Sequence, residues 1–107
     1  MLLATGTHPR GAEVAAGRFA GVEPALVEWL SAAGVRLLGI DTPSVDPLGS
    51  DDLPAHRALA AHGMVWIEGL LLDGVAAGLY ELLVLPLPLE GAEAAPVRAV
   101  LGGGGGR

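Results

Sequence analysis

Residues 55–69 read AHRALAAHGMVWIEG, and they set the expected arrangement of the chain. The first part is typical of a helix, Gly63 is a stop signal, and residues 64–67 form a short apolar run typical of a strand. His56 and Glu68 stand at the two ends of this segment. Because a chain that returns along a strand can bring distant positions together, we expect the imidazole and the carboxylate to approach each other and to suit a metal ion. Structural roles are the commoner outcome for a lone His and a lone Glu at this spacing.

Composition excludes several classes of function. The 107 residues include 12 acidic and 6 basic ones, for a net charge of −6, and no cluster of Lys or Arg could neutralise phosphates. We therefore expect no nucleic-acid partner. The absence of cysteine excludes disulfides and thiolate metal sites. The first residues lack the pattern of a signal peptide, and the apolar runs are too short to cross a membrane, so we expect a cytoplasmic protein with no membrane contact.

The N-terminal part of the sequence predicts alternating strands and helices. Pro24 suits a helix start, where its missing N–H costs nothing, and Gly34 is a stop signal. The expected segments are a strand at residues 1–4, a glycine-rich loop at 5–21, a helix at 22–33 and a buried strand at 35–41. This order is typical of an α/β unit.

A loop with the sequence TPSVDP follows at residues 42–47. Its two prolines predict a stiff segment at the C-terminal end of the preceding strand, where ligand sites of α/β sheets usually lie. Ser44 and Asp46 could face a ligand there. The alternative, that they only bond the local backbone, is the commoner outcome.

The helix expected at residues 53–62 carries two of the three histidines. A capping side chain is expected from the residues just before Pro54, namely Ser50, Asp51 or Asp52. On this helix His56 shares a face with Leu59 and Ala60, so we expect it to point where the helix packs. His62 ends the helix, and we interpret it as structural.

Glu68 ends an apolar stretch, where an unpaired carboxylate would be costly to bury. A metal ion, an arginine, a backbone donor or protonation of the carboxyl could each compensate for it. Beyond it, strands are expected at residues 79–89 and 96–101, with prolines that confine the first to a sheet edge. Residues 102–107, GGGGGR, are expected to form a flexible tail.

Several ordered blocks together resemble the cyclase family of metal-dependent hydrolases, and within it the bacterial kynurenine formamidases. The blocks are GIDTPSVDP at 39–47, AH at 55–56, IEGLLL at 67–72, GLYELLVLPLPL at 78–89 and PVRAVL at 96–101. The resemblance covers residues 1–101, which we expect to form the C-terminal portion of such a domain. It implies an α/β fold with a small mixed sheet and two to three helices, like the C-terminal half of the swivelling β/β/α cyclase-family fold.

The resemblance also implies a site and an activity. His56 and Glu68 match two ligands of a divalent metal, usually zinc, and the implied reaction is hydrolysis of N-formylkynurenine to kynurenine and formate in tryptophan degradation. Family members form homo-oligomers, which we expect here too. The implied mechanism is metal-assisted attack of water on the formyl carbon.

The family signature HxGTHxDxP, which carries further metal ligands, is missing. The similar run TGTHP at residues 5–9 has Ala4 in place of the first histidine and Arg10 in place of the aspartate, so we interpret His8 as a decoy. We therefore expect an incomplete fragment in which no catalytic residue can be assigned. The alternatives are a truncated remnant without catalysis and a family hydrolase acting on another amide such as isatin.

Overall fold

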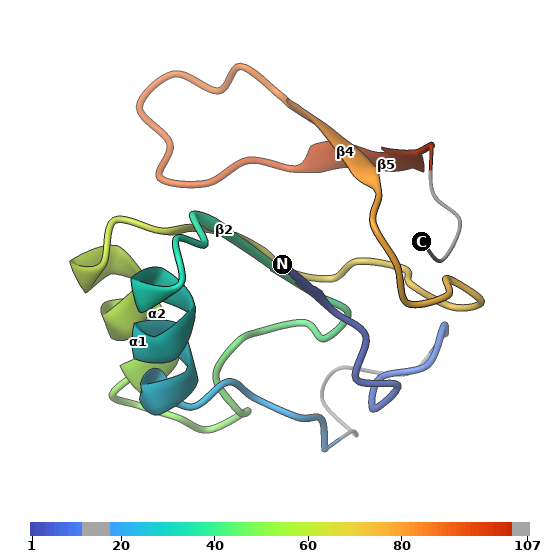
Figure 1. The fold of residues 1–107 in the computed structure, drawn as a ribbon. Coiled ribbons are helices and arrows are strands. Elements are labelled where there is room, and N and C mark those ends of the chain that lie inside the picture. Colours follow the sequence, from blue (N-terminus) through green and yellow to red (C-terminus); the bar gives the residue numbers. More distant parts are fainter. Residues whose placement is uncertain (12–17, 104–107) are drawn as a thin grey trace. The chain divides into compact units, whose positions relative to one another are not determined.

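The computed structural model describes residues 1–11 and 18–103 (Figure 1). The chain divides into two compact units, Met1–Asp73 and Gly74–Arg107. Each unit has its own sheet, and each is described by itself below.

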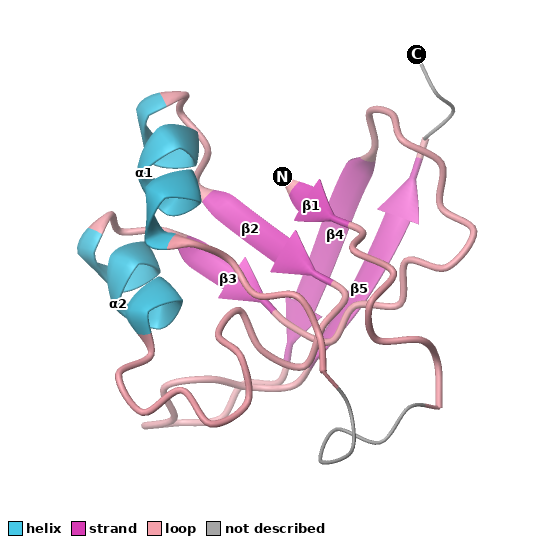
Figure 2. Ribbon diagram, turned by 90° about the horizontal axis from the view of Figure 1, so that it is seen from below, coloured by secondary structure: helices cyan, strands magenta, loops and turns pink. Residues whose placement is uncertain are grey.

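The first unit is an α/β unit in which strands and helices alternate. Its elements are β1 (Leu2–Leu3), α1 (Pro24–Ala32), β2 (Leu37–Ile40), α2 (Pro54–Ala61) and β3 (Val65–Ile67). The three strands are parallel in the order β1-β2-β3, and Leu38 of β2 is in register with Trp66 of β3. Parallel neighbours require crossover connections, and the two helices supply them (Figure 2).

Local sequence explains where α1 begins and ends. Pro24 opens the helix, where its missing N–H removes no helical hydrogen bond. Gly34 follows the last turn with φ +90°, a conformation that glycine adopts without strain. Val27 and Leu30 lie three positions apart and are both buried, so one face of the helix packs on the core.

The core of this unit lies between the two helices and the sheet. Leu38 and Ile40 of β2 are fully buried and share one face of the strand. They pack with a cluster that also includes Val22, Val27, Leu30, Val45, Ala55, Leu59 and Met64. On the opposite face of β2, a Cβ added at Gly39 would lie 2.5 Å from Leu2 Cδ2 and 2.8 Å from Leu70 Cδ1. Glycine at this position therefore permits the close packing of two leucines.

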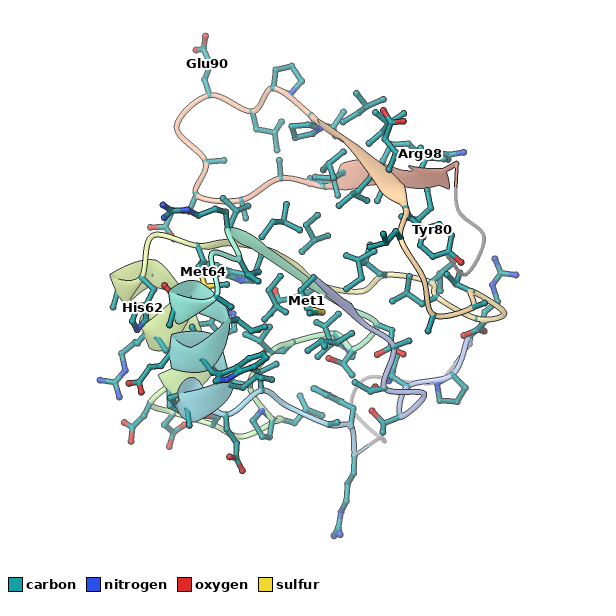
Figure 3. The ribbon with its side chains drawn as sticks, viewed as in Figure 1. Met1, His62, Met64, Tyr80, Glu90 and Arg98 are labelled. Atoms are coloured by element: carbon teal, nitrogen blue, oxygen red, sulfur yellow. The ribbon has the colours of Figure 1, made fainter. Side chains whose placement is uncertain are left out.

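The second unit is an antiparallel ribbon of β4 (Glu81–Pro86) and β5 (Val97–Gly102). The register pairs Glu81 with Gly102 and Pro86 with Val97. Just before β4, the Tyr80 hydroxyl donates a hydrogen bond to the Ala76 carbonyl oxygen at 2.7 Å (Figure 3). Both strands carry exposed apolar side chains, including Leu83, Leu85 and Val100.

The predicted α/β class is confirmed, and each expected helix and strand is present with shifted ends. The strands form two sheets rather than one small mixed sheet, because residues 81–102 pair only with each other in the described part of the chain. Residues 12–17 of the expected loop and 104–107 of the expected tail lie outside the described residues, and Gly102 belongs to β5. Within the described residues, none of the helices has the length and apolar character needed to cross a membrane.

A candidate metal centre

His56 lies in the first turn of α2, and a distant carboxylate caps that turn. The residue before the helix, Leu53, has φ +47° and no side-chain capping bond. Instead, the Oδ1 and Oδ2 atoms of Asp46 accept hydrogen bonds from the backbone N–H groups of Ala55 at 2.9 Å and His56 at 3.0 Å. The prediction of a cap from Ser50, Asp51 or Asp52 was wrong, because Asp46 already occupies the donors that such a cap would satisfy.

The same Asp46 also holds the imidazole of His56. Its Oδ2 lies 2.7 Å from His56 Nδ1, and the Asp46 residue is only 1% exposed. Burial raises the pKa of Asp46, but the hydrogen bonds from the backbone of His56 and Ala55, and then the imidazole, outweigh it and leave the pKa below its ordinary value. Asp46 is therefore a buried carboxylate whose charge is compensated by donors from α2.

Glu68 directly follows β3, and the end of β2 fixes the chain beyond it. The N–H of Gly69 donates to the Thr42 carbonyl oxygen at 2.7 Å, and the N–H of Leu70 donates to the Ile40 carbonyl oxygen at 3.0 Å. The Glu68 Oε2 atom accepts a hydrogen bond from the N–H of Val45 at 2.9 Å. Of the groups expected to compensate for the charge of this carboxylate, the structure thus shows a backbone donor.

The structure brings His56 and Glu68 together, as the helix–turn–strand segment led us to expect. His56 Nε2 lies 3.2 Å from Glu68 Oε2, and both side chains are about one quarter exposed, at 26% and 27%. Two ligand atoms that each lie about 2.0–2.2 Å from a zinc ion are roughly 3 to 3.4 Å apart when the ligand–zinc–ligand angle lies between its octahedral and tetrahedral values. The spacing of this nitrogen and oxygen thus fits two ligands of one ion, and their accessibility would let an ion reach them.

The packing of α2 differs in detail from the expected face. The buried residues of the helix are Ala55 and Leu59, whereas Ala60 is exposed. His56 directly follows Ala55 in the helix, so it lies at the edge of the buried face. Its ring meets the ring of Trp66 edge to face, with centroids 5.5 Å apart. No sequence pattern predicts that contact.

The other two histidines have separate surroundings. His62 is exposed at the C-terminal end of α2 (Figure 3), and its structural interpretation stays a prediction. His8 meets Phe19 edge to face at 6.0 Å. It also lines a hollow of about 270 Å³ together with Arg10, Asp41 and other residues.

Asp41 in that hollow is held by the segment after β1. Its carboxylate accepts hydrogen bonds from the Thr5 hydroxyl at 2.7 Å and the Gly6 N–H at 2.9 Å. Burial raises the pKa of Asp41, but these bonds outweigh it and lower the pKa below its ordinary value. Asp41 thus joins the segments that follow β1 and β2.

A complete metal-binding set is not present in the described part of the chain. Among residues 1–11 and 18–103, no group of three or more His, Cys, Asp or Glu side chains is placed to hold an ion. Structural and catalytic zinc sites use three or four protein ligands. His56 and Glu68 are two side chains of the ligand types that zinc uses, and Asp46 bonds the other ring nitrogen of His56.

Comparison with known proteins supports the fold class. No family model matches the sequence. The chain is similar to a predicted metal-dependent hydrolase from Bacillus stearothermophilus, with 34% identity and a TM-score of 0.70 over 78% of this chain and 40% of that one. It is equally similar to a potential metal-dependent hydrolase with cyclase activity, with 34% identity and a TM-score of 0.70 over 78% of this chain and 41% of that one. The chain thus spans about two fifths of the length of each.

Sequence reasoning missed the part that Asp46 plays. The alternative that polar side chains of this loop only bond the local backbone holds for Thr42 and Ser44. The Thr42 hydroxyl donates to the Ser44 carbonyl oxygen, and the Ser44 hydroxyl accepts from the Asp46 N–H. The Asp46 carboxylate instead reaches α2, 9 and 10 residues further along the chain. A helix that begins with proline and follows several polar residues is expected to have a side-chain cap. That pattern does not show which of the preceding residues, Asp46 or those nearer the helix, provides the cap.

Proposed function

We propose that this chain contributes His56 and Glu68 to the divalent metal centre of an amide hydrolase. The observation that supports the proposal most is the 3.2 Å separation of His56 Nε2 and Glu68 Oε2, with Asp46 bound to the opposite ring nitrogen. Metal-bound histidines commonly donate their other N–H to a carboxylate in this way. The similarity to two proteins described as metal-dependent hydrolases supports the same class.

Zinc is the ion we propose, because one imidazole nitrogen and one carboxylate oxygen suit it. Such an ion would supply a Lewis acid and lower the pKa of a water molecule bound to it. The residues of this chain would hold it: His56 through Nε2 and Glu68 through its carboxylate. The Val45 N–H on Glu68 Oε2 would keep that carboxylate oriented.

We propose further that additional ligands and a proton donor come from polypeptide other than the described residues. Two ligands leave a zinc ion short of the three or four it uses in proteins. A general acid must also lie within about 3 Å of the leaving nitrogen. Among the described residues, the side chains of His56 and Glu68 bond to Asp46, to Val45 and to each other, and no bond joins them to His8 or His62. The chain by itself should therefore have no appreciable activity.

The proposed substrate is N-formylkynurenine, on the resemblance of the sequence blocks to the kynurenine formamidases. The test combines purified chain with zinc and the complementary N-terminal portion of the similar Bacillus stearothermophilus hydrolase, and it follows the release of kynurenine. Isatin, a cyclic amide, serves as the competing substrate. We expect turnover of N-formylkynurenine only in the combined sample.

Two variants make this assay specific. Glu68→Gln should remove turnover, because it replaces an anionic ligand by a neutral amide, whereas His62→Gln should retain it. Turnover by the chain alone at the rate of the combined sample would contradict the proposal. A combined sample that binds zinc but hydrolyses neither amide would instead favour a remnant without catalysis.

We also propose that copies of the chain associate. The ribbon of the second unit exposes apolar side chains on both strands, including Leu83, Leu85 and Val100. Exposed apolar surface of this kind favours association. Sedimentation should show a species larger than the monomer, and a monomer at high concentration would contradict this.

A further inference from the structure

We propose that Asp46 is a positioning residue that keeps the proton of the His56 ring on Nδ1 and leaves the Nε2 lone pair free toward Glu68. The use of that lone pair for a metal rests on the proposed function. The position of the proton can be measured without any metal.

Asp46 is held firmly enough to act in this way. Its Oδ1 atom accepts a hydrogen bond from the Ala55 N–H, and its Oδ2 atom accepts one from the His56 N–H. Its own backbone N–H donates to the Ser44 hydroxyl at 3.1 Å. The residue is 1% exposed, so water does not replace these donors. The carboxylate is thus fixed by the start of the same helix that carries the histidine.

Two carboxylates compete for the single N–H of a neutral imidazole. Asp46 Oδ2 lies 2.7 Å from Nδ1, while Glu68 Oε2 lies 3.2 Å from Nε2. If the proton were on Nε2, the Nδ1 lone pair would face the Asp46 oxygen at the shorter distance. That arrangement is unfavourable, because an ionised carboxylate can only accept hydrogen bonds. The shorter contact and the buried carboxylate therefore favour the proton on Nδ1.

The Glu68 carboxylate is the more adaptable partner. Its side chain is 27% exposed, and it is held by one backbone donor, the Val45 N–H. Asp46 is instead held by two donors from α2 besides the imidazole. Trp66 limits rotation of the ring because it meets the imidazole edge to face. These contacts give Asp46, rather than Glu68, control of the tautomer.

The consequence concerns the availability of a ligand atom. Histidine binds a metal through an unprotonated nitrogen, and the hydrogen bond at the other nitrogen sets which one that is. Loss of such a carboxylate typically weakens metal affinity about 10- to 100-fold. Asp46 would therefore affect zinc affinity without touching the ion.

The test is long-range ¹H–¹⁵N NMR of the metal-free, full-length chain, recorded at a pH where the same spectra show the ring of His56 to be neutral. This measurement distinguishes an Nδ1–H ring from an Nε2–H ring. The wild type should show His56 mainly as Nδ1–H. Asp46→Ser removes the carboxylate and leaves a hydroxyl that is one bond shorter and cannot reach the ring nitrogen, so it should shift His56 to mainly Nε2–H.

Two control variants locate the effect. Glu68→Gln removes the competing charge and should leave His56 as Nδ1–H. Asp41→Asn changes a carboxylate that bonds Thr5 and Gly6 instead of a histidine, and it should also leave the ring unchanged. A tautomer shift in Glu68→Gln but not in Asp46→Ser would overturn the inference.

The wild-type spectrum alone can also refute it, so the test does not depend on the folding of Asp46→Ser. A wild-type ring that is mainly Nε2–H would overturn the inference. Zinc titration of the same samples separates it from the proposed function. If the wild type binds no zinc, the metal centre is contradicted, while an Nδ1–H ring still supports the positioning role of Asp46. If it binds zinc, Asp46→Ser should weaken the affinity about 10- to 100-fold.

Discussion

Replacing Asp46 by alanine should destabilise the first unit strongly, because one carboxylate serves both the start of α2 and the imidazole. The variant removes the acceptor for the N–H groups of Ala55 and His56, and the Ala55 residue is fully buried. Loss of a helix cap costs about 1 kcal/mol. A buried donor left without an acceptor costs about 1–3 kcal/mol more. We expect the free energy of unfolding to fall by about 2–4 kcal/mol.

Urea unfolding followed by tryptophan fluorescence measures this loss, because both tryptophans lie in the first unit. The matched control is Asp41→Ala, which also removes a carboxylate with two hydrogen bonds to other residues. Because those bonds lie nearer the surface, the control should lose about 1 kcal/mol or less. Equal losses in the two variants would refute the reasoning, since they would show that the capping role of Asp46 adds nothing.

Three further predictions concern the same unit and use the same unfolding measurement. Leu59→Ala should lower the free energy of unfolding by about 2–4 kcal/mol, because Leu59 is fully buried. Leu71 is 62% exposed, so Leu71→Ala should change that free energy by less than about 0.5 kcal/mol, and similar losses in the two variants would contradict the prediction. Gly39→Ala should cost about 1–3 kcal/mol because its Cβ would overlap Leu2, and a neutral result would show that the leucines move aside freely. The pKa of Asp41 is lower in the folded state than its unfolded value of 3.8, so ionised Asp41 stabilises the fold above that pH, and this stability is lost as the pH falls through the folded pKa. Asp41→Asn should therefore lose less stability than the wild type below about pH 4. An unchanged profile of stability against pH would contradict this.

The elements of the fold could be predicted because their signals are local. Pro24 and Pro54 begin the two helices, and Gly34 and Gly63 follow them with positive φ. Apolar runs marked the strands. The division into two sheets could not be predicted in this way, because strand pairing depends on contacts between distant residues.

The candidate site could be predicted only in part for the same reason. The approach of His56 and Glu68 followed from a short helix, a turn and a strand, which are consecutive in the chain. The contacts of Asp46 with α2 depend on the path of residues 41–53, including the left-handed backbone at Leu53. Leucine is an uncommon residue for that conformation, so the sequence favoured a conventional cap near Pro54.

Zinc titration of the purified chain tests the proposed metal centre most directly. Calorimetry should show one zinc ion per chain with a dissociation constant of about micromolar or weaker, because two protein ligands are fewer than zinc sites normally use. His56→Gln and Glu68→Gln should each abolish this binding, and the control His62→Gln should retain it. Binding that persists in both site variants, or no binding by the wild type, would contradict a metal centre at His56 and Glu68.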